Sequence, residues 1–366
     1  MPKGGQLNNR NNSLNVLPYV CGLLFYCLTS SLAQAQPADD ERPLLDVSIQ
    51  IFAMNVPEDA LTQQAQGVYP AVRQAESRYL PSFLKLILEE SGSWGAVRLL
   101  PERDSGAELQ ISATIVSSNG TQLELALVAK DATGRIWADK TYTGTAVESV
   151  SLNQPLLGTD PFLYLYQSIT NDLAEVAVSL SIAQLNEIKS VALLQYASLL
   201  APAVFTPYLS SGENGMISLV RLPADNDPFL LRVKQIREHE YVFIDVVDEQ
   251  YESFFVTIKP VYDLWRRYRR EQISSEIDKI NREVQQGNDL PRGSYMSLLE
   301  SYNNFRWARM QDQYLDEISE GFTNEVLPTD INLEDSLYHL SGTLEEQYQE
   351  WKIILKELYE LDALPQ

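Results

Sequence analysis

The chain has 366 residues, of which 50 are acidic and 28 are basic, and its formal net charge is −22. Hydrophobic residues make up 45% of the chain, which is the composition of a folded protein and not of a disordered one. The acidic excess argues against nucleic acid or anionic lipid as a broad binding partner, because phosphate groups are bound by clustered Lys and Arg.

The first 35 residues have the pattern of an export signal. A polar, weakly basic start precedes an apolar stretch at residues 16–28, and the segment ends in Ala-Gln-Ala at 33–35. This order predicts a secretory signal peptide over residues 1–35, cleaved near Ala35. The apolar stretch is shorter than the roughly 20 residues of a spanning helix. We therefore expect a periplasmic protein, free or peripheral to a membrane, with no transmembrane span in the mature chain.

Both cysteines lie inside this predicted leader. Large apolar residues precede Cys21 and Cys27, so neither position suits lipid attachment. Cleavage near Ala35 would leave a chain without a disulfide, a thiol nucleophile or a thiolate metal ligand.

Residues 44–150 are predicted to form a mixed sheet with helices packed on it. Apolar residues at spacings of three and four predict a helix over 71–90, in which Pro81 should produce a kink or mark the true start. Alternating stretches predict strands, and Asn119-Gly120 and Thr133-Gly134 are typical of hairpin turns between the last three. The expected strands are 44–52, 96–100, 108–117, 122–131 and 135–143.

A family resemblance accompanies this order of elements. Residues 107–114, together with the stretch 130–144 and its Asp-Ala-Thr-Gly-Arg-Ile-Trp turn, resemble the periplasmic α/β domain shared by several envelope proteins. These are the curli secretion channel subunit, the amino-terminal domain of TolB and lipoprotein activators of penicillin-binding proteins. The resemblance covers residues 44–145, and it places 73–80 on a helix against the sheet. Because most members are scaffolds, secretion parts or activators, it implies a non-enzymatic role.

Residues 159–366 are predicted to form a mainly helical domain. Helices are expected over 160–180, 182–196, 227–236, 244–284 with a kink at Pro260, 295–326, and from 344 onward. A small hairpin is expected at 330–340, and Thr343 with Glu346 forms a capping box before the last helix. The predicted fold class is therefore α+β, with an amino-terminal mixed sheet and packed helices followed by a mostly helical domain.

The sequence contains no recognisable catalytic or cofactor motif. It lacks a nucleophile elbow, a Walker loop, a dinucleotide fingerprint and the His-Glu-x-x-His zinc motif. His239 lies between Glu238 and Glu240, but adjacent residues of a helix point about 100° apart and cannot easily share one ion. His339 is interpreted as structural. We expect no catalytic residue, no metal and no cofactor.

One basic cluster is the candidate binding site. Trp265, Arg266, Arg267, Arg269 and Arg270 place four arginines together in a very acidic chain. Arginine in such a cluster can bind lipid headgroups, an acidic glycan or an acidic protein face. The alternative is pairing within the chain, with Glu271, Glu276, Asp278 or the acidic carboxyl-terminal region.

These features together favour a non-enzymatic accessory or scaffold protein of the bacterial cell envelope, acting in assembly, secretion or cell-wall synthesis. Its expected partners are envelope proteins or an anionic envelope component, and its oligomeric state stays open. One alternative is a carboxylate-dependent hydrolase of envelope glycan, which would show two acids with separated pKa values in a deep pocket. Another is a small-ligand-binding protein with an aromatic-lined cleft.

Overall fold

The structure covers the predicted sheet and most of the predicted helices. The computed structural model describes residues 42–147, residues 160–286 except 213 and 225, residues 302, 309, 313 and 314, and residues 328–361 except 334 and 335. The leader with its cleavage site and the predicted domain boundary near 150–159 lie outside the described residues. Of the helix predicted over 295–326, the structure describes four residues, all in helical conformation.

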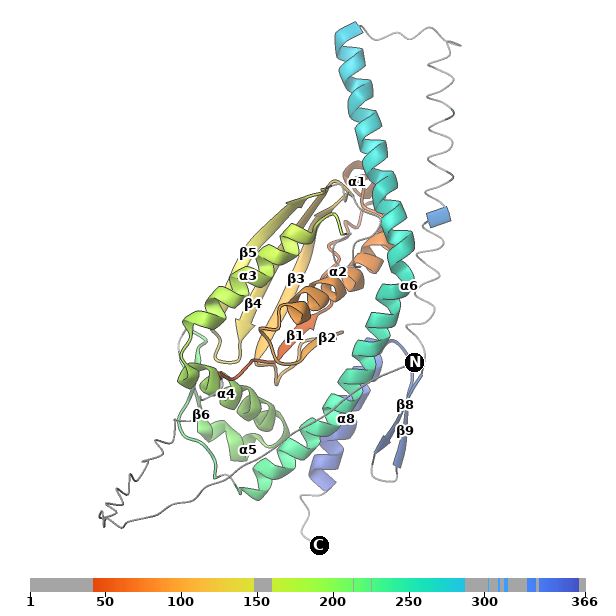
Figure 1. Ribbon diagram of the computed structural model, residues 1–366. Helices are drawn as coiled ribbons and strands as arrows, with labels where there is room; N and C mark the ends of the chain where they lie inside the picture. The colour runs from red at the N-terminus through yellow and green to blue at the C-terminus, as the bar shows by residue number, and fades with distance from the viewer. Residues whose placement is uncertain are drawn as a thin grey trace, which may run out of the picture. The chain divides into compact units, whose positions relative to one another are not determined.

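A five-stranded mixed sheet forms the amino-terminal part, as predicted. Its strand order is β2-β1-β3-β4-β5, with β1 parallel to β2 and β3, and with β3, β4 and β5 antiparallel (Figure 1). The strands are β1 (Val47–Gln50), β2 (Val97–Leu100), β3 (Leu109–Ser118), β4 (Gln122–Asp131) and β5 (Ile136–Thr145). Together with the mostly helical remainder, this sheet gives the α+β class.

Helices cover one face of this sheet. Side chains alternate along the strands, so Ile111 and Leu127 are buried while Ser112 and Val128 lie on the opposite, partly exposed face. Figure 1 shows α2 (Pro70–Glu90) and α3 (Leu163–Ser179) on the covered face and α6 beside β2. A short helix, α1 (Ala60–Gln66), precedes α2. The other face is rich in small and polar residues, which suits a face in contact with water.

Helix α2 passes through Pro81 without ending there, which corrects the expected start. The helix begins at Pro70, a favourable position because the first turn has no use for the missing N–H. Pro81 cannot donate to the carbonyl of Ser77, but the Phe52 N–H donates to that carbonyl instead at 2.8 Å. The backbone after β1 therefore replaces the hydrogen bond that proline removes.

Two helices and a small hairpin follow α3. These are α4 (Ile182–Leu200), α5 (Pro202–Phe205), a 3₁₀ turn η2 (Thr206–Tyr208), β6 (Leu209–Ser211) and β7 (Ile217–Leu219). A capping box between Ser181 and Gln184 begins α4. Within the described part of the chain, no single helix has the length and apolar character needed to cross a membrane; α3 and α4 together would pass on those criteria alone, but they bend by 108° between them.

One helix, α6 (Pro228–Gln286), replaces the two helices predicted over 227–236 and 244–284. Asp227 caps its start, since its carboxylate accepts from the Phe229 N–H at 2.9 Å. The helix runs through Pro260, and residues 237–243, which the apolar periodicity left unassigned, continue it without a break. Those residues include Arg237 and Glu240, which are buried although they are charged. A search for apolar residues at helical spacing therefore does not detect this part of the helix.

The carboxyl-terminal elements match the prediction. Strands β8 (Thr329–Leu333) and β9 (Ser336–Leu340) form the expected hairpin, and α8 (Leu344–Leu361) follows. The Thr343 hydroxyl accepts from the Glu346 N–H at 3.2 Å, and the Glu346 carboxylate accepts from the Thr343 N–H at 2.9 Å. The capping box read from the sequence is therefore confirmed.

The helices of both predicted parts share one hydrophobic core with the sheet. Tyr79 on α2 stacks on Phe255 of α6 with ring centroids 4.7 Å apart. Phe243 on α6 stacks on Tyr348 of α8 at 5.9 Å. Helix α2 thus packs against both the sheet and α6, and α8 packs against α6.

Replacing Gly120 with alanine tests how closely α6 approaches the sheet. Gly120 has φ +84°, and a Cβ there would lie 2.9 Å from the Arg266 carbonyl oxygen on α6. Gly215 has φ +74° and open space around it, so Gly215→Ala carries the same backbone cost of about 1 to 2 kcal/mol without a clash. We expect Gly120→Ala to lower the free energy of unfolding clearly more than Gly215→Ala in urea titrations. Equal losses would show that α6 has room to move.

Candidate functional site

The structure separates the predicted basic cluster into buried and accessible members. Trp265 and Arg266 are each 1% exposed and Arg269 is 8% exposed. Arg270 is half-buried and donates to the Gly120 carbonyl at 3.3 Å, while Arg267 is exposed. Only Arg267 and Arg270 therefore reach the surface, and partner binding by this cluster stays a prediction.

Arg266 pairs inside the protein, with acids other than those expected from the sequence. Its guanidinium lies 2.8 Å from the carboxylate of Asp160, which is fully buried, and also contacts Asp263. The Tyr262 ring lies against the guanidinium at 4.5 Å. Asp160 is 106 residues away in the chain, so no local pattern could have revealed this pair. Arg266 therefore pairs within the chain, as the alternative expected, but among the described residues its partners are Asp160 and Asp263 and not Glu271, Glu276 or Asp278.

A second buried acid lies close to this pair. Glu76 on α2 is fully buried and accepts hydrogen bonds from Ser118 on β3 at 2.5 Å and from Tyr262 on α6 at 2.8 Å. Arg73 pairs with it at 3.1 Å. Burial raises the pKa of Glu76 above its ordinary value, although the charge of Arg73 and these hydrogen bonds act against the rise. The Glu76 carboxylate therefore links α2, β3 and α6.

Arg266→Gln and Arg267→Gln form a matched pair that tests the structural role of the cluster. Removing the Arg266 charge leaves Asp160 buried with its charge uncompensated, which should cost about 3 to 5 kcal/mol of unfolding free energy. Arg267 is exposed, so its replacement should change stability by less than about 0.5 kcal/mol. Urea unfolding measures both. Similar values for the two variants would contradict the assignment.

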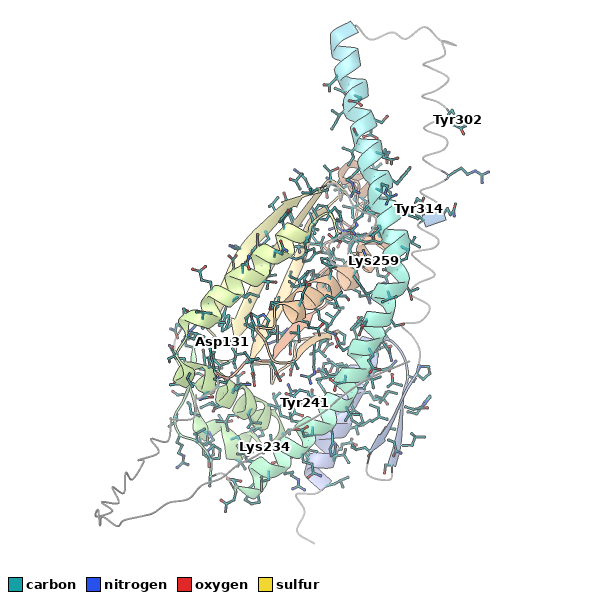
Figure 2. The ribbon with its side chains drawn as sticks, viewed as in Figure 1. Asp131, Lys234, Tyr241, Lys259, Tyr302 and Tyr314 are labelled. Carbon is teal, nitrogen blue, oxygen red and sulfur yellow. The ribbon has the colours of Figure 1, made fainter. Side chains whose placement is uncertain are left out.

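A further ionic cluster holds the amino-terminal half of α6. Arg237 lies 2.6 Å from Asp104, in the loop between β2 and β3, and 2.6 Å from Glu240. Tyr348 of α8 donates to Glu240 at 3.1 Å. The Tyr241 ring, labelled in Figure 2, lies 4.5 Å from the same guanidinium. Burial would raise the pKa of Asp104, but the charge and hydrogen bonds of Arg237 outweigh it and lower this pKa.

The lowered pKa of Asp104 predicts a pH dependence of stability. A carboxyl whose pKa is lower in the folded state stabilises the fold above its unfolded-state pKa, and this contribution is lost as the pH falls through the folded-state pKa. Asp104→Asn should therefore cost about 3 kcal/mol near neutral pH, and the difference from the wild type should shrink in strong acid. Asp245→Asn, at an exposed partner of Arg98, is the control and should cost less than about 1 kcal/mol. A difference for Asp104→Asn that stays constant with pH would contradict this account.

The middle of α6 covers the β2 edge of the sheet. The Asp248 carboxylate accepts from the Leu99 N–H of β2 at 2.9 Å and from Lys85 of α2 at 2.6 Å. An edge strand with free N–H groups is a template for pairing with another chain. Because β2 has only four residues and lies under α6, this edge is blocked.

The open face of the sheet carries two clefts. One has a volume of about 440 Å³ and the other about 190 Å³, and both are lined by Gln50, Ser112 and Val128. The larger is lined mostly by small and polar residues. The smaller contains two acids, Asp104 and Asp131, the second of which is labelled in Figure 2.

Both acids of the smaller cleft are already engaged by the fold. Arg237 holds Asp104, while the Asp131 carboxylate accepts from Thr133 at 2.6 Å and from the Trp137 indole at 2.8 Å. Asp131 closes the β4–β5 turn, and Asp104 anchors α6. Both carboxylates are therefore occupied by hydrogen bonds or ion pairs within the fold. Across the described residues, no group of three His, Cys, Asp or Glu side chains could hold a metal ion.

A third cleft, of about 480 Å³, lies between strand β5 and helix α3. One wall is the strand itself, along residues 140–145. The other is a ridge of Tyr164, Ser168 and Asp172, spaced four apart and therefore on one face of α3. We call this cleft the β5–α3 groove. Both elements are predictable from the sequence, but their position beside each other is not.

Charges close one end of the β5–α3 groove. Lys140 of β5 pairs with Asp172 of α3 at 2.6 Å, and the Tyr142 hydroxyl donates to the same carboxylate at 2.7 Å. Burial, and then the bond to Asp172, raise the pKa of Tyr142 above its ordinary value. At the other end, Gly144 lets α3 approach, because a Cβ there would lie 3.1 Å from Leu165. Tyr164 is 69% exposed beside it.

Comparison of the chain with protein-family models, with curated proteins and with solved structures gives no match in any of the three. The functional interpretation therefore depends on the residues and geometry described above.

Proposed function

We propose that this chain is an exported, non-enzymatic accessory or scaffold protein of the bacterial cell envelope, which acts by binding other proteins. The observation that carries the proposal is the β5–α3 groove beside an open sheet edge. Surfaces of this kind bind partners through backbone hydrogen bonds and side-chain pockets, and they need no reactive group.

The ionisable groups support binding over catalysis. The two acids of the smaller cleft and the acids near Arg266 are engaged in ion pairs or hydrogen bonds that hold the fold together. A catalytic carboxylate needs room for a substrate atom within hydrogen-bond reach. The groove offers instead a walled surface next to strand β5, whose outward backbone groups have no hydrogen-bond partner among the described residues.

The proposed location is the periplasm. It is supported by the leader-like pattern of residues 1–35 and by the resemblance of residues 44–145 to an envelope domain. Assembly, secretion or cell-wall synthesis is the class of process that this resemblance suggests, and each remains part of the proposal.

Site-specific photo-crosslinking in the native host tests the proposal. A photoreactive phenylalanine analogue is placed at Tyr164 in the groove, or at Ile353, which is 60% exposed on α8, as the control. We expect the Tyr164 position, and not Ile353, to give a discrete adduct with an envelope protein. Fractionation and amino-terminal sequencing should place the chain in the periplasm, beginning after Ala35. A cytosolic chain, identical adducts at both positions, or no adduct would contradict the proposal.

A further inference from the structure

The unpaired backbone of β5 points into the β5–α3 groove. The Ala146 N–H donates to the Thr121 carbonyl at 2.8 Å, so residue 146 faces β4. Backbone groups alternate in direction along a strand. The N–H and C=O groups of Thr145, Thr143, Thr141 and Asp139 therefore face away from β4. Within the described part of the chain, none of them has a hydrogen-bond partner.

At one end of this series of outward backbone groups, the chain already forms one hydrogen bond of the kind that an added strand would make. The Val147 N–H, next in the outward series, donates to the Pro161 carbonyl just before α3 at 3.0 Å. Strand β5 is ten residues long and contains no proline. Its Lys140 side chain turns to Asp172 and to the Tyr142 ring, and so leaves the edge clear. Among the described residues, neither a proline nor an outward-pointing lysine therefore protects the edge along residues 141–145.

The shape of the groove favours a single strand over the edge of another folded sheet. Helix α3 forms a wall along β5 through Tyr164, Ser168 and Asp172, and this wall limits access to the edge. A volume of about 480 Å³ lies in the range of clefts that bind ligands. An extended segment can enter such a groove, whereas a second copy of this chain that paired through its own β5 would bring its own α3 against the groove.

Charge favours a basic occupant. Lys140 and Asp172 neutralise each other, which leaves Asp139 and Glu124 beside the exposed threonines of the edge. Glu124 lies directly opposite Thr143 in the ladder. The net charge of −22 also attracts a cationic partner at long range.

We propose that an extended, positively charged peptide segment of a partner protein binds in the β5–α3 groove as a sixth strand of the sheet. This inference rests on the proposed binding function and specifies its partner. Backbone hydrogen bonds to Thr141 and Thr143 provide affinity, and alternate side chains of the segment contact Tyr164 and Ser168 on one side and the open face of the sheet on the other.

Peptide selection tests the inference. A phage library of random twelve-residue peptides is panned on the full chain, and enriched peptides are synthesised for fluorescence anisotropy. We expect enriched sequences that alternate β-branched or aromatic residues with Lys or Arg. Thr143→Pro removes only an outward N–H, and should weaken binding about tenfold or more. Thr143→Val keeps that N–H and should bind within about twofold.

Two further measurements keep the test independent of how well Thr143→Pro folds. N-methylation of alternate peptide amides leaves side chains and charge unchanged, and in one of the two registers it should also reduce affinity about tenfold. Ser168→Trp should fill the groove while leaving the sequence and the backbone N–H groups of β5 unchanged, and should therefore also prevent binding. Equal binding of methylated and unmethylated peptides, loss of binding in Thr143→Val, or no enrichment at all would overturn strand addition.

The inference and the proposed function can fail separately. If the Tyr164 photo-adduct persists in a folded Thr143→Pro chain, the protein binds a partner but not as an added strand. If the wild-type chain gives no adduct from Tyr164, the proposed function itself fails.

Discussion

The fold depends on buried and half-buried charges that fix α6 to the sheet. Three charged residues lie along this helix. Arg237 pairs with Asp104 in the loop before β3, Asp248 accepts a hydrogen bond from the edge of β2, and Arg266 pairs with Asp160 just before α3. An apolar stripe alone allows a helix to slide or rotate on its support, whereas a buried charge is tolerated only where its partner lies. We infer that these ion pairs set the position of α6 along the sheet, and that the surrounding aromatic residues supply most of the favourable free energy of burial.

This constraint also determines which surfaces remain open. Because α6 lies along β2, the short parallel edge of the sheet is covered, and α8 packs against α6. Helix α3 reaches the opposite side, where Asp160 connects its start to Arg266. The same pair that holds α6 therefore also holds the beginning of the helix that walls the groove. This ionic contact joins α6 to the start of the helix that forms one wall of the β5–α3 groove.

Much of the fold was predictable because its signals are local. Alternation predicted the strands of the meander to within about two residues, and the pair Thr343 and Glu346 predicted the start of the last helix. The continuity of α6 was not predicted, because residues 237–243 carry charged side chains whose burial depends on Asp104 and Tyr348, far away in the chain.

The candidate site was less predictable, for the same reason. Arg266 lies four residues after Tyr262 and so on the same helical face, which is a signal available in the sequence. An arginine on an apolar face can be interpreted as buried only when its partner is known, and Asp160 is distant. No sequence motif predicts the groove, because it forms only where β5 and α3 lie side by side in the fold. A long final strand of a meander, with threonine at alternate positions and no proline, is the one sequence feature that indicates an available edge.

Only one of the two margins of the five-stranded sheet is covered by α6, and this difference has a consequence for self-assembly. Growth of a fibre by lateral pairing requires every molecule to expose two compatible margins, so that each newcomer offers a fresh site for the next. Here Asp248 and the helix that carries it cover one margin. Any pairing through the remaining margin is consequently self-limiting: it can join this protein to one neighbour and then stops, so a crowded compartment would hold finite complexes in place of filaments.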